Sequence, residues 1–292
     1  MKISYYPGCT LKNTAKNFEI SAIAVAKHLG VEFVELPKWN CCGTVYSLTS
    51  DDLMHQLAPI RNLLRVEENG FDRVVTLCSM CYNTLKRANL MVNRSPENLK
   101  KINDFMYKEK TRYSGKVRVL HFLEILRDEI GLDEIRKHVK KPLKGLKFAT
   151  YYGCLLVRPP EAAMDDVENP HFMGELIEAL GGEVVDFPYS TECCGSYNTV
   201  SRKQMVLDKT YEIINMAHLQ GADALILSCP LCDFNLEARQ KDVAEVYPDF
   251  HYMPVLYFTQ LMTVAFGLDP ETYGFEFNTV DPMPLFKEKG VL

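Results

Sequence analysis

Residues 73–81 read RVVTLCSMC and residues 224–232 read ALILSCPLC, so a short apolar run enters a Cys-x-x-Cys pair twice in one chain. Short β-branched and aliphatic runs of this kind are typical of buried strands. Working outward from each pair, a Cys-Cys-Gly triplet precedes it, at residues 41–43 and 193–195. A single cysteine stands further upstream, at residues 9 and 154. The ten cysteines therefore form two copies of one five-cysteine pattern, and none is left over.

The segments around the cysteines repeat as well. Residues 3–9 (ISYYPGC) parallel 148–154 (FATYYGC), and residues 119–126 (VLHFLEIL) parallel 255–262 (VLYFTQLM). Two homologous halves follow, with a boundary near Lys144, so we expect a first domain over residues 1–144 and a second over 145–292 that includes a C-terminal tail.

Each half alternates short strand-like runs with longer helix-like stretches. We expect strands at residues 2–6, 31–36, 73–77, 117–121, 147–151, 183–187, 224–228 and 253–257. We expect helices at residues 15–29, 52–69, 122–130, 172–180 and 205–219. The pattern predicts an α/β fold of two Rossmann-like halves related by pseudo-two-fold symmetry, each a small parallel sheet flanked by helices. The cysteines would then lie at the carboxyl ends of strands and at helix N-termini, where an anionic group is stabilised.

Composition limits the classes of partner. The 292 residues carry a formal charge of −5, which argues against nucleic acid as the main partner. No run of 18 apolar residues is present and the N-terminus has no apolar signal region, so we predict no membrane span and a cytoplasmic protein. The basic run at residues 136–147 is interpreted as a solvated linker, with a docking patch as the alternative.

The cysteine pattern favours iron–sulfur clusters. Thiolates are soft ligands that select zinc, cuprous copper or iron–sulfur clusters, and a structural zinc site needs four ligands. Each half supplies five, and two adjacent cysteines reach two irons of a cluster more readily than one tetrahedral ion. A cubane needs only four thiolates, which leaves the fifth cysteine unexplained. Zinc in at least one half, and thiol–disulfide exchange without metal, remain alternatives at this point.

Other cofactor motifs are absent from the sequence. It has no G-x-G-x-x-G after a strand, no P-loop, no H-E-x-x-H and no ferredoxin-type cysteine run. We therefore expect no flavin or nicotinamide in this chain, and we expect electrons to arrive from a partner protein.

The doubled pattern resembles the family of duplicated cysteine-rich CCG domains, and within it most closely the catalytic B subunit of heterodisulfide reductase from methanogens. The resemblance covers nearly the whole chain and implies two non-cubane [4Fe-4S] clusters. By this resemblance, the catalytic and iron-binding residues are the ten cysteines. One cluster would be bound by Cys9, Cys41, Cys42, Cys78 and Cys81, and the other by Cys154, Cys193, Cys194, Cys229 and Cys232.

The resemblance also implies a reaction and partners. The chain would reduce the heterodisulfide of coenzyme M and coenzyme B to two thiols in methanogenesis, with the disulfide between the two clusters. Electrons would come from two partner subunits, one a ferredoxin-like iron–sulfur protein and the other flavin-containing, with a hydrogenase or formate dehydrogenase further upstream. The alternative is an electron-transfer subunit of a related oxidoreductase, of the succinate, lactate, glycolate or glycerol-3-phosphate dehydrogenase type.

Several residues near the cysteines are interpreted as structural. Lys12, Lys16, Arg158 and Arg202 lie near the predicted cluster loops, and we treat them as ordinary surface charges rather than substrate-binding residues. The histidines are expected to be core or boundary residues, because cysteine already supplies a full ligand set. The tail at residues 270–292 is interpreted as a strap on its own domain, with partner docking as the alternative.

Overall fold

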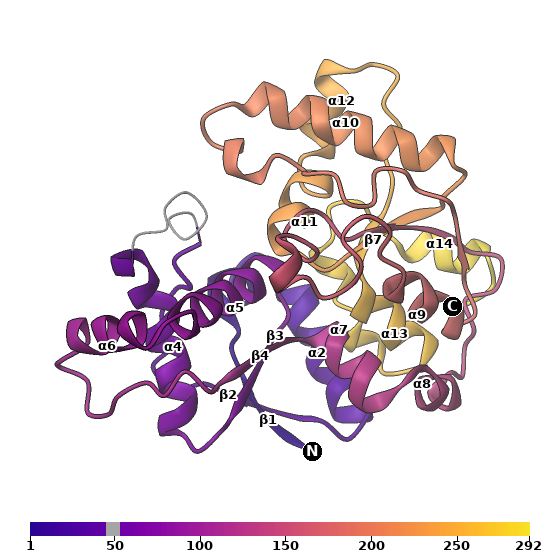
Figure 1. Ribbon diagram of the computed structural model, residues 1–292. Helices are drawn as coiled ribbons and strands as arrows, with labels where there is room; N and C mark the ends of the chain where they lie inside the picture. The colour runs from indigo at the N-terminus through magenta and orange to yellow at the C-terminus, as the bar shows by residue number, and fades with distance from the viewer. Residues whose placement is uncertain (45–52) are drawn as a thin grey trace.

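The computed structural model describes residues 1–44 and 53–292 and contains two parallel sheets, one in each half (Figure 1). The first sheet has the order β2-β1-β3-β4 and the second the order β6-β5-β7-β8, so the two topologies are the same. The first comprises β1 (Lys2–Tyr5), β2 (Glu32–Glu35), β3 (Arg73–Thr76) and β4 (Arg118–His121). The second comprises β5 (Lys147–Tyr151), β6 (Glu183–Val184), β7 (Ala224–Leu227) and β8 (Val255–Tyr257). The predicted α/β class with two similar halves is confirmed.

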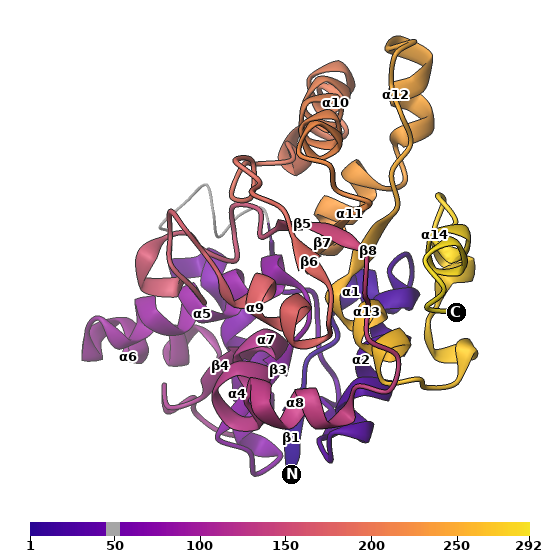
Figure 2. The same cartoon turned by 90° about the vertical axis from the view of Figure 1, so that its right-hand side faces the viewer.

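Helices connect and flank the strands in both halves (Figures 1 and 2). In the first half they are α1 (Gly8–Leu11), α2 (Lys16–His28), α4 (Leu57–Glu68), α5 (Ser79–Asn93), α6 (Pro96–Phe105), α7 (Phe122–Ile125) and α8 (Leu132–His138). In the second half they are α9 (Phe172–Ala179), α10 (Lys203–Leu219), α11 (Pro230–Leu236), α12 (Gln240–Val246), α13 (Phe258–Ala265) and α14 (Met283–Glu288). Within the described residues, no helix is both long and apolar enough to cross a membrane.

All eight predicted strands are present, seven of them shorter than expected by one to three residues. The strand predicted over 183–187 ends at Val184, although the Val185 N–H still donates to the Phe148 carbonyl at 3.0 Å. Of the predicted helix over 52–69, residue 52 lies outside the described residues. The predicted boundary residue Lys144 lies in the loop between α8 and β5, and the boundary itself stays a prediction.

The two halves share a continuous core, because α2 of the first half packs along α13 of the second (Figure 1). The Phe18 ring stacks on Tyr257 with centroids 4.1 Å apart, and its edge meets Phe258 at 5.6 Å. The Ser21 and Thr259 hydroxyls form a buried hydrogen bond of 2.6 Å across the same interface. The relative position of the halves is therefore fixed by interior contacts.

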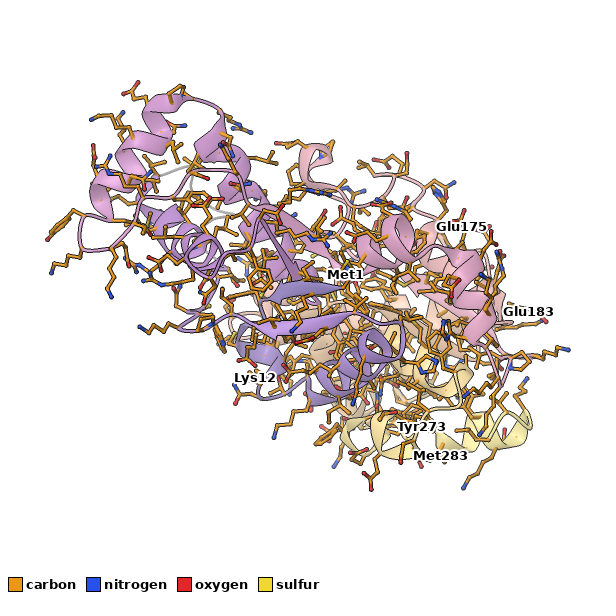
Figure 3. All side chains as sticks on the ribbon, turned by 90° about the horizontal axis from the view of Figure 1, so that it is seen from below. Met1, Lys12, Glu175, Glu183, Tyr273 and Met283 are labelled. Atoms are coloured by element: carbon orange, nitrogen blue, oxygen red, sulfur yellow. The ribbon has the colours of Figure 1, made fainter. Side chains whose placement is uncertain are left out.

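The C-terminal segment crosses from the second half back to α2. Gly274 adopts a φ of +66°, and a Cβ there would lie 2.7 Å from Cα of Asn17, so only glycine fits. The Gln260 amide donates to the Tyr273 carbonyl at 2.9 Å, and the Asn278 amide donates to the Val255 carbonyl at 3.0 Å. Figure 3 shows Tyr273 and Met283 on this segment. These contacts agree with the strap interpretation of the tail.

A buried histidine connects the end of β4 to the loop that carries a cysteine. The His121 Nε2–H donates to the Leu77 carbonyl at 2.7 Å, and its Nδ1 accepts from the Leu123 N–H at 3.2 Å. Leu77 directly precedes Cys78, so this imidazole helps to position the first Cys-x-x-Cys pair.

Stability should fall in mild acid because of His121. Burial lowers the pKa of His121 to about 4, whereas an unfolded histidine titrates near about 6.5. Between pH 4 and 6.5 the imidazole is protonated in the unfolded chain but neutral in the folded one. The stabilising free energy of the neutral, buried His121 is therefore complete above pH 6.5 and is lost as the pH falls toward 4. The loss is about 3 kcal/mol, measurable by urea unfolding across that range. His121→Gln should flatten the pH dependence; the exposed His171→Gln should not, and equal slopes in both variants would contradict this assignment.

Candidate metal centre

The strand order places the cysteine loops at one point in each sheet. In an order of 2-1-3-4, the connections from the first and third strands leave in opposite directions, and the gap between them is the usual ligand site of open α/β sheets. Cys9 follows β1 and Cys78 follows β3. In the second half Cys154 follows β5 and Cys229 follows β7, in equivalent positions.

Each Cys-x-x-Cys pair lies at the start of a helix, as predicted. Cys78 and Cys229 are the N-cap residues of α5 and α11, with extended backbone, and Cys81 and Cys232 lie in the first turns. All four are buried. The local sequence explains this arrangement, because an apolar strand runs directly into a helix start that Pro230 favours in the second copy.

The Cys-Cys pairs lie before rather than within helices. Cys193-Cys194 directly precede the one-turn 3-10 helix Ser196–Asn198, and the N–H of its N-cap residue Gly195 donates to Sγ of Cys193 at 3.4 Å. Cys41-Cys42 and Cys193-Cys194 lie in irregular loops, several residues beyond β2 and β6. The following residues, Gly43 and Gly195, have φ of +82° and +77°. This left-handed backbone strongly favours glycine and explains the Gly of each triplet.

Two other glycines are the ones that allow close approach to sulfur. A Cβ on Gly8 would lie 3.0 Å from Sγ of Cys81, and one on Gly153 would lie 3.4 Å from Sγ of Cys232. Both have positive φ as well. The glycine before the first cysteine of each set therefore makes room for the last cysteine of that set.

Replacing Gly8 by alanine should displace Cys81. The left-handed backbone costs alanine about 1–2 kcal/mol of folding free energy, and the new methyl would press on the Cys81 sulfur. Gly30 is a matched control, since its φ is +75° but a Cβ added there would meet no atom within 4 Å. We expect a loss of stability by urea unfolding in both variants, larger in Gly8→Ala, and loss of bound iron only in Gly8→Ala. Equal iron content in the two would contradict the packing role.

A buried tyrosine supports each Cys-Cys loop in the same way. The Tyr6 hydroxyl donates to the carbonyl of Asn40 at 2.8 Å, and the Tyr151 hydroxyl donates to the carbonyl of Glu192 at 2.6 Å. Asn40 and Glu192 directly precede the two pairs. Burial raises the pKa of both tyrosines, and four thiols of the same set raise each one further. These two rings, among the aromatic residues around the cysteines, shield the thiols from water.

The ten thiols are free and lie in a connected array rather than in two isolated groups. Within the first set, Cys41 and Cys81 lie close enough to Cys42 to lower its pKa, and Cys78 lies close enough to Cys81 to raise its pKa. Within the second, Sγ of Cys194 and of Cys232 are 3.5 Å apart, and Cys229 lies close enough to Cys232 to raise its pKa. Cys78 and Cys229 lie close enough for each to shift the pKa of the other, and so they join the two sets.

The outer cysteines complete the sets. Cys193 lies close enough to Cys154 to raise its pKa, and Cys9 lies close enough to Cys41 to raise its pKa. Beside this junction the Ser79 and Ser228 hydroxyls form a buried hydrogen bond of 2.8 Å between the halves. The structure thus brings together all ten cysteines that the sequence singled out.

Three positions in the array favour thiolate. Hydrogen bonds from Cys41 and Cys81 lower the pKa of Cys42, and those from Cys232 and Cys78 lower the pKa of Cys229. The hydrogen bond from Cys154 lowers the pKa of Cys193 to about 6. Neighbouring thiols and burial raise the pKa of five others, which are Cys41, Cys78, Cys81, Cys154 and Cys232. Metal ligation requires the thiolate form, so these five would release their protons when metal binds.

The chemistry of the donor set fits iron–sulfur ligation. Each half supplies five soft thiolates, and six of the ten are buried. Cys9 and Cys41 are exposed and Cys154 and Cys193 are partly exposed, so each set has one end that solvent reaches.

Two of the four cations that the sequence places near the cysteines have partners in the structure. Lys12 forms ion pairs of 2.8 Å with both Glu19 and Glu35, and Arg158 donates to the Thr191 carbonyl at 3.1 Å. The residues that the sequence analysis missed are polar and buried: Ser79, Ser228 and Asn235. Asn235 lies three residues after Cys232, on the same side of its helix, and that spacing is the signal that could have drawn attention to it.

Comparison with known proteins identifies the repeated unit. The profile of the CCG cysteine-rich domain matches residues 3–86 and 148–237. A relative from Wolinella succinogenes, named 8-methylmenaquinol:fumarate reductase membrane anchor subunit, is 31% identical over 97% of this chain and 99% of its own. A relative from Methanosarcina acetivorans, named as the B subunit of a ferredoxin/F(420)H(2)-dependent CoB-CoM heterodisulfide reductase, is 30% identical over 96% of this chain and 94% of its own.

A solved structure shares the fold. A hypothetical protein from Helicobacter pylori superimposes with a TM-score of 0.73 at 14% identity, over 95% of this chain and 51% of that one. With two matched cysteine-rich segments and relatives aligned over nearly their full length, the chain belongs to the duplicated CCG cysteine-rich domain family, which includes the B subunit of heterodisulfide reductase.

Proposed function

We propose that this chain is the catalytic subunit of a heterodisulfide reductase, which reduces the disulfide between coenzyme M and coenzyme B to two thiols. The observation that carries the proposal is the meeting of two five-thiol sets beside the buried Ser79–Ser228 hydrogen bond of 2.8 Å, where Cys78 and Cys229 lie close enough to shift each other's pKa. The names of relatives, among them reductase subunits and an iron–sulfur protein, support an oxidoreductase that works within a complex.

In this proposal each half holds one non-cubane [4Fe-4S] cluster. The ligands would be Cys9, Cys41, Cys42, Cys78 and Cys81 in the first half, and Cys154, Cys193, Cys194, Cys229 and Cys232 in the second. When bound, such clusters exchange single electrons and their irons accept thiolates as ligands. Two one-electron sites in one chain match the overall reaction, in which a disulfide takes up two electrons and two protons to give two thiols.

The protein's own residues have three tasks in this reaction. The α2–α13 packing and the Ser79–Ser228 hydrogen bond keep the two sets next to each other. Tyr6 and Tyr151 close the inner side of each set to water. The exposed ends at Cys9–Cys41 and Cys154–Cys193 leave the route by which a small disulfide approaches.

The proposal includes partners and a compartment. Electrons would come from a ferredoxin-like iron–sulfur protein and a flavin-containing protein of the same complex, with a hydrogenase or formate dehydrogenase upstream. Each half, residues 1–144 and 145–292, would act as one cluster-binding domain. Ten cysteines that would ligate iron need a compartment that keeps thiols reduced, and we place the chain in the cytoplasm.

A second candidate function is electron transfer without a disulfide substrate. The relative from Wolinella succinogenes, named as a subunit of 8-methylmenaquinol:fumarate reductase, is the observation that favours it. In that case the same clusters would pass electrons between a quinol and a dehydrogenase partner.

An assay with an artificial donor separates the two candidates. The anaerobically purified chain, with any subunits that copurify, would receive reduced viologen and the heterodisulfide. The first candidate predicts two oxidised viologens and two free thiols for each disulfide, with loss of turnover in Cys42→Ser and Cys194→Ser. Clusters that viologen reduces fully, without any thiol release, would instead support the electron-transfer candidate.

A further inference from the structure

A buried asparagine donates toward the second cysteine set. Asn235 in α11 is completely buried, and its Nδ2 donates to the Cys194 carbonyl at 3.0 Å and points to Sγ of Cys194 at 3.6 Å. Sulfur accepts hydrogen bonds at longer distances than oxygen, so 3.6 Å is within range of an N–H···S contact.

The side-chain amide has a second partner, because its Oδ1 accepts from the Thr199 hydroxyl at 2.6 Å. The backbone at this position is also held, since the Thr210 hydroxyl donates to the backbone carbonyl of Asn235 at 3.1 Å. A flipped amide would turn its oxygen toward the Cys194 carbonyl, where two acceptors would face each other. The N–H therefore points to the cysteine.

The equivalent position in the first half does something different. Thr84 lies three residues after Cys81, as Asn235 lies three after Cys232, and its hydroxyl donates to the Met80 carbonyl at 2.9 Å. Sγ of Cys42, the counterpart of Cys194, instead contacts the Thr44 hydroxyl at 3.0 Å. The halves share topology and cysteine pattern. The second cysteine of each Cys-Cys pair nevertheless has a different hydrogen-bonding side chain in each half.

We propose that Asn235 is a positioning residue that sets the reduction potential of the cluster in the second half alone. A hydrogen bond to a ligand sulfur withdraws electron density from it and so stabilises the reduced, more negative state of a cluster. The two clusters would then titrate separately, each tuned by its own donor: Asn235 in the second half and Thr44 in the first. This inference rests on the cluster-binding part of the proposed function and not on its substrate.

The test is a reductive titration of the cluster-loaded protein, followed by electron paramagnetic resonance and visible absorption. Asn235→Ala should move one of the two transitions to a more negative potential and leave the other in place. Thr44→Val should move the other transition in the same direction. Thr199→Val, which only loosens the amide, should give a smaller shift of the same transition as Asn235→Ala.

Asn103→Ala is the matched control. Asn103 is also buried, and its amide donates to the carbonyls of Leu99 and Tyr113 at 3.0 and 2.9 Å, away from the cysteine sets. We expect it to lower stability without moving either transition. Unchanged transitions in Asn235→Ala, equal shifts of both, the same shift in Asn103→Ala, or no cluster in the second half would each overturn the inference. Because no turnover is measured, failure of the disulfide assay leaves this test intact.

Discussion

Replacement of Cys194 by serine should remove about half of the bound iron and abolish disulfide reduction. Cys194 is buried and contacts both Cys232 and Asn235 within the second set. Serine is a hard and less acidic ligand, so a cluster that needs this thiolate should be lost or strongly perturbed. If each electron of the reaction comes from a separate set, one intact set cannot complete the two-electron reduction.

The symmetric variant Cys42→Ser provides the internal control for this result. It should also lose about half of the iron, about four of eight atoms if each set holds a four-iron cluster. The electron paramagnetic resonance signal that disappears should be that of the first-half cluster, whereas Cys194→Ser should remove that of the second. Iron and turnover would be measured in the same preparations. Full heterodisulfide reduction by either variant would contradict a mechanism that uses both sets.

Phe18→Ala should cost about 3–5 kcal/mol of folding free energy, the range for removing a fully buried phenylalanine. Its ring is completely buried between the halves, stacked on Tyr257 and in edge contact with Phe258. The loss should also loosen the contact of Cys78 with Cys229, because the α2–α13 packing fixes the halves relative to each other. Urea unfolding gives the free energy, and the coupling between the two clusters' resonance signals should weaken with it.

Ile23→Ala is the control for this prediction on the same helix. Ile23 is 43% exposed, so its loss should be much smaller than that of the fully buried Phe18. If the two variants lost similar free energy, the interface would not be the source of the stability.

The sequence was sufficient to predict the strands and the cysteine pairs on the helices. RVVTLC and ALILSC are apolar runs long enough for a buried strand, and the cysteine that ends each run caps the following helix. Because the pattern repeats, the same strands and helix starts could be predicted for both halves. Parallel pairing followed from the alternation of strands and helices and is confirmed.

Other features depend on contacts that no local pattern encodes. The spacing of apolar residues in α2 predicts a buried face but not that its partner is α13, which lies at the opposite end of the sequence. The left-handed backbone of Gly43 and Gly195 directly after each Cys-Cys pair was not predicted from the sequence. Asn235 was not noticed because its partner, Cys194, is brought to it only by the fold.

The most direct test of two clusters in one chain is the metal content of the protein purified without oxygen, together with any subunits that copurify. We expect about eight irons per chain with matching acid-labile sulfide and no zinc, as two four-iron clusters require. About four irons with one zinc would mean that one half is structural, and the reaction at two joined thiol sets would have to be abandoned.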